Sequence, residues 1–256
     1  MVYGELIYHP VVTKLLKFLD SSASREKLLR LLQYLCRFLT FYTFKRNFNI
    51  ETIQLIKKIQ SSIGISRKPL RFLKNLPHLK NLNKIYSNEL LDSTLKIGDL
   101  IKNFGYALYF QFDTLQWLKL LGLLTSKNSG SLYFKIDKLA ANFWLIGLTG
   151  SIITDLRNLK ISYDSNKALL NEINSQNNNS NNDTLDEKLI EQNNDLILKN
   201  NEKINLNKRD LFKNILDSLI ALKGSQLIDL NDGVLGFAGI ITSIIGIEDI
   251  WNATKA

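Results

Sequence analysis

The sequence predicts an all-α fold, and three features of its composition and pattern support this. Proline is rare, with three residues in a chain of 256, whereas β-rich folds need more frequent breaks at turns. Leucine, isoleucine, lysine and asparagine are abundant, which is typical of long helices joined by polar loops. In several segments the apolar residues recur every three or four positions, the spacing that places them on one face of a helix. We therefore expect amphipathic helices in the N-terminal half and more apolar helices in the middle and at the C-terminus.

The N-terminal part is expected to contain three helices separated by two breaks. Residues 10–19 are expected to form a short helix that begins near Pro10, a residue that is tolerated in a first helical turn. A turn over residues 20–23 separates it from a second helix, and residues 45–49 form the next break. A third helix is expected over residues 50–63, where isoleucines are spaced for one side. These are Ile53, Ile56, Ile59 and Ile63.

Residues 24–42 carry the clearest helical pattern in the chain. At about 100° per residue, five leucines lie in one narrow stripe, and Lys27, Arg30 and Arg37 lie on roughly the opposite side. The leucines of this stripe are Leu28, Leu31, Leu32, Leu35 and Leu39. A narrow, leucine-rich stripe is typical of a seam between packed helices. We expect it to pack on residues 10–19 or on another copy of the chain, as a helix-packing or self-association surface.

Residues 66–86 combine an apolar side with a basic side. Pro69 fits a helix start and Pro77 fits a kink or a break, so we expect either one bent helix or two short ones. The apolar side is formed by Phe72, Leu76, Leu79, Leu82 and Tyr86. The basic residues are Arg67, Lys68, Arg71, Lys74, Lys80 and Lys84. This combination is typical of a helix that lies in a membrane interface, and the alternative is a basic surface helix on a soluble bundle.

Two apolar segments occupy the middle of the chain. Residues 100–124 are rich in aromatic and aliphatic side chains, but Lys102, Asp113 and Lys119 interrupt them. Because a charge near the bilayer centre costs a few kcal/mol, we expect a protein-packed or interfacial helix there. Residues 139–154 carry no charge and would form a helix about 24 Å long, which is short of the ~30 Å hydrocarbon core. This segment is either a tilted or bilayer-thinning element or a core helix.

The segment 162–209 differs from its surroundings in composition. Fourteen of its residues are asparagine, and such prolonged polarity does not support a packed core. We expect an Asn-rich flexible loop, at most with a frayed helix around residues 184–199.

In the C-terminal part the sequence predicts a helix over residues 211–222 and a second one over residues 234–247. The second segment carries no charge. Gly236, Gly239 and Gly246 lie in or beside the second segment, and small residues on an apolar helix permit close helix approach in lipid. The alternative is a glycine-loosened helix in a soluble core, which the low helix propensity of glycine disfavours. We therefore expect a C-terminal membrane helix.

The basic residues are concentrated at the N-terminal end. Residues 1–90 contain 16 Lys and Arg against 5 Asp and Glu, whereas the remaining residues contain 17 against 19. A basic, leucine-rich helical region attracts polyanions, which are either nucleic acid or an anionic phospholipid membrane.

Catalytic and metal-binding patterns are absent from the sequence. The single cysteine, Cys36, lies in a leucine-rich helix, where a small core residue is expected. His9 and His78 belong to no recognisable metal-ligand or catalytic motif. The chain also lacks the glycine-rich loops that cradle nucleotide phosphates. We therefore expect neither an enzyme nor a bound cofactor.

Several sequence blocks together resemble the peroxin-eleven family of peroxisomal membrane proteins, specifically its fungal form. The resemblance covers nearly the whole chain. The blocks are Tyr8-His9-Pro10, Lys17-Phe18-Leu19-Asp20, Arg25-Glu26-Lys27-Leu28-Leu29-Arg30-Leu31-Leu32-Gln33-Tyr34, Arg71-Phe72-Leu73-Lys74, and Ile241-Thr242-Ser243-Ile244-Ile245-Gly246 with Trp251. Ser24 stands where the family commonly has glycine, and the Asn-rich tract replaces a more mixed polar linker.

The resemblance implies a protein that remodels and elongates the peroxisome membrane and thereby promotes peroxisome fission and proliferation. In the family an amphipathic helix inserts into the cytosolic leaflet, the termini face the cytosol, and the protein forms homo-oligomers and recruits a dynamin-type fission machinery. Carried onto this chain, the inserting helix is residues 66–86. Its apolar side would enter the acyl boundary and its six basic residues would hold lipid headgroups.

The resemblance also defines the expected regions and the main alternative function. Residues 1–90 would be a basic helical region on the cytosolic side, 91–161 would hold apolar membrane-associated helices, 162–209 the loop, and 210–256 the C-terminal membrane helix and tail. The alternative is a pore for small metabolites, which the family has also been linked to. Its polar path would be lined by Lys102, Asp113 and Lys119. The resemblance and the uncharged C-terminal segments weigh against nucleic acid as a partner.

Overall fold

The structure is a computed structural model that describes residues 9–89, 92–179 and 184–255. Within these ranges every regular element is a helix, which confirms the predicted all-α class. The elements are α2 (Pro10–Asp20), α3 (Ser22–Lys45), α4 (Ile50–Arg67), the 3-10 turn η1 (Pro69–Arg71), α5 (Asn75–Tyr86), α6 (Ser93–Leu120), α7 (Ser126–Ser129), α8 (Leu132–Asn179), α9 (Thr184–Gly224) and α10 (Asp232–Ala253).

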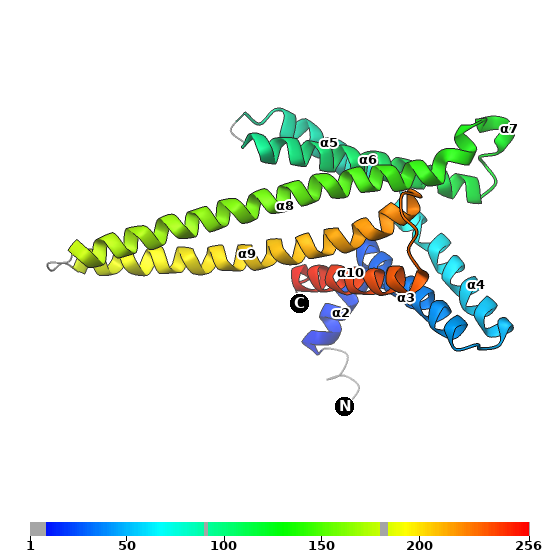
Figure 1. Cartoon of the computed structure of the whole chain (residues 1–256), viewed down its shortest axis with the longest axis horizontal. Helices are drawn as coiled ribbons and strands as arrows, with labels where there is room; N and C mark the ends of the chain where they lie inside the picture. The colour runs from blue at the N-terminus through cyan, green and yellow to red at the C-terminus, as the bar shows by residue number, and fades with distance from the viewer. Residues whose placement is uncertain (1–8, 90–91, 180–183, 256) are drawn as a thin grey trace.

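The two longest helices, α8 and α9, form an antiparallel hairpin whose far end extends well beyond the other helices (Figure 1). At the near end of this hairpin, α6 packs along α8, and α5 packs along α6. On the other side α10 contacts α9 and packs along α3, which in turn packs on α4. We call this near end, with α3, α4, α5, α6, α10 and the adjoining parts of α8 and α9, the body.

The segment around residues 66–86 contains two helical pieces rather than one bent helix. α4 continues to Arg67, beyond the expected end at residue 63, and Pro69 begins η1. The chain then turns at Leu73, whose φ is +61°, and α5 starts at Asn75. Pro77 lies in the first turn of α5 and does not break it, because the missing N–H of a residue there is not needed within the helix.

The expected flexible loop over residues 162–209 is wrong for the described part of that range. α8 continues to Asn179, and α9 begins at Thr184 and passes through residue 209 without a break. The tract contains neither glycine nor proline, and its amides bond across the hairpin. Asn166 Nδ2 donates to Asn201 Oδ1 at 2.8 Å, and Asn200 donates to Ser165 Oγ at 3.0 Å. Pairing of the two helices therefore supports a composition that would not hold a single helix in water.

The central helices of the body approach each other through glycine. A Cβ placed on Gly105 of α6 would lie 2.2 Å from the backbone nitrogen of Gly147 on α8. Such an approach lets two backbones meet without side chains between them, as in small-residue helix pairs of membrane proteins. α8 and α10 are also the two helices of the described chain that are long and apolar enough to cross a membrane.

The glycines of α10 pack against α3. A Cβ on Gly236 would lie 2.7 Å from the Phe38 backbone nitrogen, and one on Gly239 would lie 2.2 Å from the Tyr34 ring. These glycines therefore bring α10 close to α3, the helix that carries the leucine stripe. α2 does not fill the predicted role of partner along that stripe, because its buried Phe18 instead meets Trp251 of α10 edge to face at 5.6 Å between ring centroids.

Candidate functional site

The α3 helix has its polar side inside and its leucine stripe outside. Leu32, Leu35 and Leu39 are 47, 40 and 39 % exposed, and Leu28 and Leu31 are half-buried. The buried residues of the helix are Ser24, Glu26, Arg30, Tyr34, Thr40 and Thr43. A helix of a water-soluble protein shows the opposite arrangement, with the apolar stripe against the core. Among the described residues, the part of the predicted packing seam formed by Leu32, Leu35 and Leu39 is therefore left exposed.

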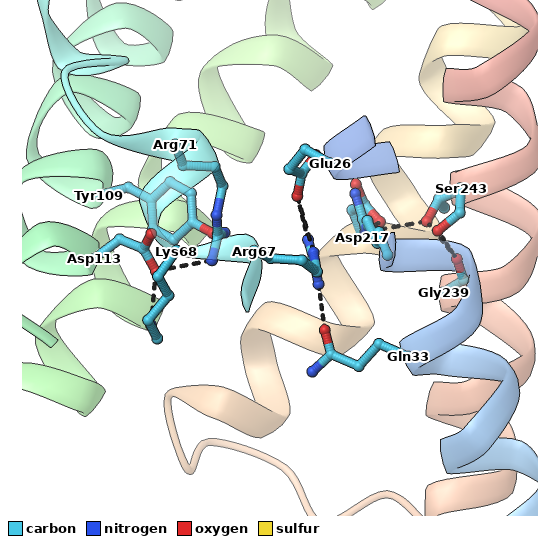
Figure 2. A network of polar contacts seen from close by, with 12 residues as sticks. Glu26, Gln33, Arg67, Lys68, Arg71, Tyr109, Asp113, Asp217, Gly239 and Ser243 are labelled. Atoms are coloured by element: carbon cyan, nitrogen blue, oxygen red, sulfur yellow. Dashed lines mark hydrogen bonds and ion pairs between the residues drawn. The ribbon is translucent and has the colours of Figure 1, made fainter. Parts of the chain in front are cut away.

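Arg67, at the end of α4, lies in the polar interior of the body. Its guanidinium donates to Glu26 of α3 from Nε at 3.0 Å and from Nη2 at 2.5 Å, and Nη1 donates to Gln33. Figure 2 shows the Arg67 side chain between these two partners. Burial acts to raise the pKa of Glu26, but the charges of Arg67, Lys27 and Arg71 outweigh it and hold the pKa well below its usual range. The prediction that Arg67 binds headgroups is wrong for this structure, because the side chain is only 8 % exposed.

Lys68 and Arg71 converge on Asp113 of α6. Lys68 Nζ lies 3.0 Å and Arg71 Nη2 lies 3.1 Å from the same carboxylate oxygen. Arg71 Nη1 also donates to the Tyr109 hydroxyl at 2.6 Å, and Lys68 donates to Gln116 at 2.6 Å. The charges of Lys68 and Arg71 therefore fasten η1 onto α6, and they do not lie beside the apolar side of α5, where the headgroup prediction placed them.

A third charged contact joins α3 to the C-terminal helices. Arg30 Nη2 donates to Asp217 of α9 at 2.6 Å and to Thr242 of α10 at 3.1 Å. All three partners are buried. The three groups around Asp113, Glu26 and Asp217 follow one another across the body (Figure 2). Helical periodicity places Arg30 on the polar side of α3, but it gives no sign that this side faces the interior.

A cavity of about 740 Å³ lies among these groups. Its walls come from α3, α4, α6, α8, α9 and α10, with Lys68, Arg71 and Lys74 from the connection that leads to α5. The cavity is therefore lined by the charged interior of the body, and the long outer part of the α8–α9 hairpin takes no part in it.

The apolar side of the α5 segment is largely exposed, although the Phe72 ring, in the turn before α5, meets Trp117 of α6 edge to face at 6.0 Å between ring centroids. Phe72, Leu76, Leu79 and Tyr86 are between 49 and 75 % exposed, whereas Leu82 is half-buried. The opposite side of α5 is bound to α6, where His78 Nδ1 lies 3.1 Å from Asn103 Oδ1 and Asn75 donates to Gln111 at 2.9 Å.

The basic residues of the α5 segment divide into two groups. Lys80 and Lys84 are exposed beside the apolar side, and Lys74 is half-buried at the start of α5. Burial lowers the pKa of Lys74, while Glu26 acts in the opposite direction. Of the six predicted headgroup ligands, Lys80 and Lys84 are therefore freely accessible and Lys74 lies at the wall of the cavity.

The three charges predicted to line a pore are not brought together. Lys102 lies 3.9 Å from Asp99 of its own helix, and Lys119 pairs with Asp137 of α8 at 3.0 Å. Asp113 alone of the three lines the cavity. The described residues also contain no group of three or more His, Cys, Asp or Glu side chains arranged to hold a metal ion.

The protein family follows from comparison of the whole chain with known proteins. The family model described as "Peroxisomal biogenesis factor 11 (PEX11)" matches residues 12–251. The chain belongs to this family. Membership in the PEX11 family confirms the predicted resemblance and assigns the chain to the peroxisomal membrane and to peroxisome proliferation. The family is one of membrane biogenesis factors and is not a known enzyme class.

Individual members of the PEX11 family match this chain over all or nearly all of their lengths. Peroxisomal membrane protein PMP30A of Candida boidinii is 93 % identical over 256 residues, which is all of both chains. Peroxisomal membrane protein PMP27 of Saccharomyces cerevisiae is 33 % identical over 260 residues, covering 99 % of this chain and 100 % of the relative. The peroxisomal membrane protein 11 homolog of Dictyostelium discoideum is 30 % identical, with 95 and 96 % covered. No solved structure matches the chain.

Proposed function

We propose that this PEX11-family protein elongates the peroxisomal membrane by inserting the apolar side of α5 into its cytosolic leaflet. The observation that carries this proposal is the exposed apolar side of α5 with Lys80 and Lys84 beside it. An apolar helix side of this kind enters the boundary between headgroups and acyl chains, and each lysine near an anionic surface contributes roughly 1 kcal/mol. Insertion on one side expands one leaflet and favours curvature. In this mechanism the protein needs neither a catalytic site nor a cofactor.

The rest of the body constrains how α5 meets the membrane. α5 runs along α6, and α6 runs along the apolar part of α8 (Figure 1). We propose that these helices lie together along the membrane, because the uncharged part of α8 would be only about 24 Å long against the ~30 Å hydrocarbon core. The termini are proposed to face the cytosol, where a dynamin-type fission machinery would act on the elongated membrane.

Removal of the two exposed lysines is expected to weaken membrane remodelling without loss of fold. Full-length Lys80→Glu/Lys84→Glu should bind anionic vesicles at least tenfold more weakly than the wild type, because two attractive charges near the surface become repulsive. Vesicle flotation measures binding, and electron microscopy measures tubulation. A matched control is Lys57→Glu/Lys58→Glu on α4, which changes the same number of exposed charges outside α5. Equal binding by both double variants would contradict the proposal.

A cross-link tests whether α5 remains on α6 during insertion. In a Cys36→Ser background, Asn75→Cys and Gln111→Cys place thiols at side chains that are in hydrogen-bond contact, within reach of a short bismaleimide. The cross-linked protein should still tubulate vesicles if the helices lie along the membrane together. Tubulation that requires cleavage of the link would show instead that α5 leaves α6.

We further propose that the protein forms homo-oligomers through the leucine stripe of α3. The residues Leu28, Leu32, Leu35, Leu39 and Tyr42 are spaced by four, three, four and three positions, which is the repeat of a seam between two long helices. The stripe has no partner along its exposed part within the described chain. A second copy of α3 carries the same repeat, so we propose it as the helix that packs against the stripe.

Charge on this stripe is expected to abolish self-association. Leu35→Glu/Leu39→Glu would place two carboxylates opposite two more in a symmetric pair, which costs several kcal/mol of association free energy. Chemical cross-linking and light scattering of the detergent-purified protein should then show a monomer where the wild type shows an oligomer. The control is Leu55→Glu/Ile59→Glu on the exposed side of α4, and an unchanged oligomer in the α3 variant would contradict the assignment.

A further inference from the structure

The cavity in the body has more basic than acidic side chains in its walls. Seven lysines and arginines line it, against five aspartates and glutamates. Every one of the five carboxylates is already paired. The pairs are Glu26 with Arg67, Asp113 with Lys68 and Arg71, Asp137 with Lys119, Asp217 with Arg30, and Asp249 with Arg209 and Lys213. No carboxylate of the wall is left over for a further cation.

Two lysines of the wall are left without a counter-charge in contact. In the described part of the chain, Lys27 of α3 and Lys74 before α5 take part in no ion pair or side-chain hydrogen bond. Both lie near the Glu26–Arg67 pair, whose charges act on each of them. Lys27 extends along α10, where its Cε would lie 3.2 Å from a Cβ placed on Gly246. An ammonium that is partly removed from water without a partner is costly, so an anion bound in the cavity beside these lysines would stabilise the body.

A third donor of the cavity wall is also unused. The Nε atom of Arg71 is buried and has no hydrogen-bond partner, although both of its terminal nitrogens are engaged by Tyr109 and Asp113. Buried N–H groups are almost always satisfied, by protein, water or a ligand. Arg71 lines the same cavity as the two lysines, so the cavity offers a ligand two ammonium groups and one unused N–H donor.

We propose that this cavity binds an anion that carries a terminal phosphate group. A phosphomonoester presents three acceptor oxygens with a charge between −1.5 and −2 at neutral pH, which matches two ammonium groups and one guanidinium N–H. A carboxylate has two acceptor oxygens and a single charge. The cavity of about 740 Å³ also has room for an organic group attached to the phosphate. This site is separate from the exposed side of α5, so the inference does not rest on the proposed membrane insertion.

The protonation of Lys27 gives the site a measurable signature. Burial and, to a smaller extent, the neighbouring charge of Arg30 lower the pKa of Lys27 to about 8, while Glu26 and Asp217 act in the opposite direction. A bound anion favours the charged ammonium and raises this pKa. At pH 8 binding should therefore take up protons. The charged groups that act on Lys27 are Glu26 and Arg30 on α3 itself, Arg67 on α4 and Asp217 on α9. Lys213 of α9 and Asp249 of α10 line the same cavity.

Calorimetry on the full-length protein in detergent tests the free anion. Inorganic phosphate is the probe, and malonate is the carboxylate comparison. We expect phosphate to bind the wild type, with proton uptake at pH 8 that appears as a difference in heat between two buffers of different ionisation enthalpy. Lys27→Gln/Lys74→Gln should weaken binding at least tenfold and abolish the proton uptake. Lys80→Gln/Lys84→Gln removes two charges outside the cavity and should leave both unchanged.

Vesicles distinguish a lipid headgroup from a free phosphate compound. Vesicles that contain phosphatidic acid present a phosphomonoester, whereas phosphatidylglycerol presents a phosphodiester. If the ligand is a lipid headgroup, free phosphate will not bind, and the wild type will prefer phosphatidic acid. Lys27→Gln/Lys74→Gln should then lose this preference. Lys80→Gln/Lys84→Gln should instead weaken binding to both lipids alike. Circular dichroism checks that each variant is folded. Three results would overturn the proposal: malonate that binds as tightly as phosphate, no binding of phosphate together with no preference for phosphatidic acid, or no difference between the two lysine pairs with either probe.

Discussion

Replacement of Arg67 by methionine is expected to lower the free energy of unfolding by about 3 to 5 kcal/mol at neutral pH, because it leaves the buried carboxylate of Glu26 without its partner. Arg67 holds Glu26 and Gln33 on α3 from the end of α4, so its loss also frees that end of α4. Chemical unfolding of the full-length protein in detergent, followed by circular dichroism, measures the effect. The double variant Glu26→Gln/Arg67→Met should recover most of the loss, since neither charge remains.

The Glu26–Arg67 pair also determines the direction in which the free energy of unfolding changes with pH. The folded-state pKa of Glu26 lies below its unfolded value, so this carboxylate stabilises the wild type above about pH 4.5, and the contribution is lost as the pH falls through and below that value. In Arg67→Met the opposing charge is gone and burial raises the pKa, so the penalty should shrink between pH 7 and pH 5. A penalty that stays constant over this range would show that Glu26 is not the source of the loss.

The substitution Gly105→Ala is expected to give the second large effect, because α6 and α8 touch through their backbones at this point. The new methyl group would lie 2.2 Å from the Gly147 nitrogen, so the helices must separate. Overpacking of this kind costs about 1 to 3 kcal/mol, and here we expect the upper end, since backbone atoms cannot rotate aside. Thermal unfolding in detergent measures the change.

Gly246→Ala is the matched control for Gly105→Ala. Its methyl group would meet only the flexible side chain of Lys27, at 3.2 Å, and alanine is favoured over glycine in a helix by about 1 kcal/mol. This variant should be as stable as the wild type or more stable. Equal destabilisation by both substitutions would contradict the close approach of α6 to α8.

Helix positions were predictable from the sequence because periodicity and turn residues act locally. The break at residues 45–49 and the start of α2 at Pro10 lie where those signals place them. The sequence did not predict which side of α3 faces the interior. The rule that an apolar stripe points inward holds only where water surrounds the molecule. For α3 this rule gives the wrong face, and its leucines lie outside.

The candidate site was only partly predictable for the same reason. Arg67, Lys68 and Arg71 lie on the polar side of their segment, as periodicity indicates. Their partners Glu26 and Asp113 are between 41 and 45 positions away in the chain, which a local pattern does not reveal. The sequence did give one indication of these contacts, because Glu26 is an acidic residue in a basic segment and Asp113 is a charged residue in an apolar segment. In the Asn-rich tract, conversely, composition was a poorer guide than the absence of glycine and proline.

The polar interior of the body changes how its stability depends on temperature. In a water-soluble domain, unfolding exposes apolar core to water, and the resulting heat-capacity increase of about 12 to 15 cal/mol/K per residue curves the stability with temperature. Here an apolar cluster around Ile220 and Leu235 is joined in the interior by pairs such as Glu26 with Arg67 and Arg30 with Asp217. Exposure of polar groups lowers the heat capacity. We therefore expect the stability of this body to follow a flatter curve than that of a core built from apolar side chains alone.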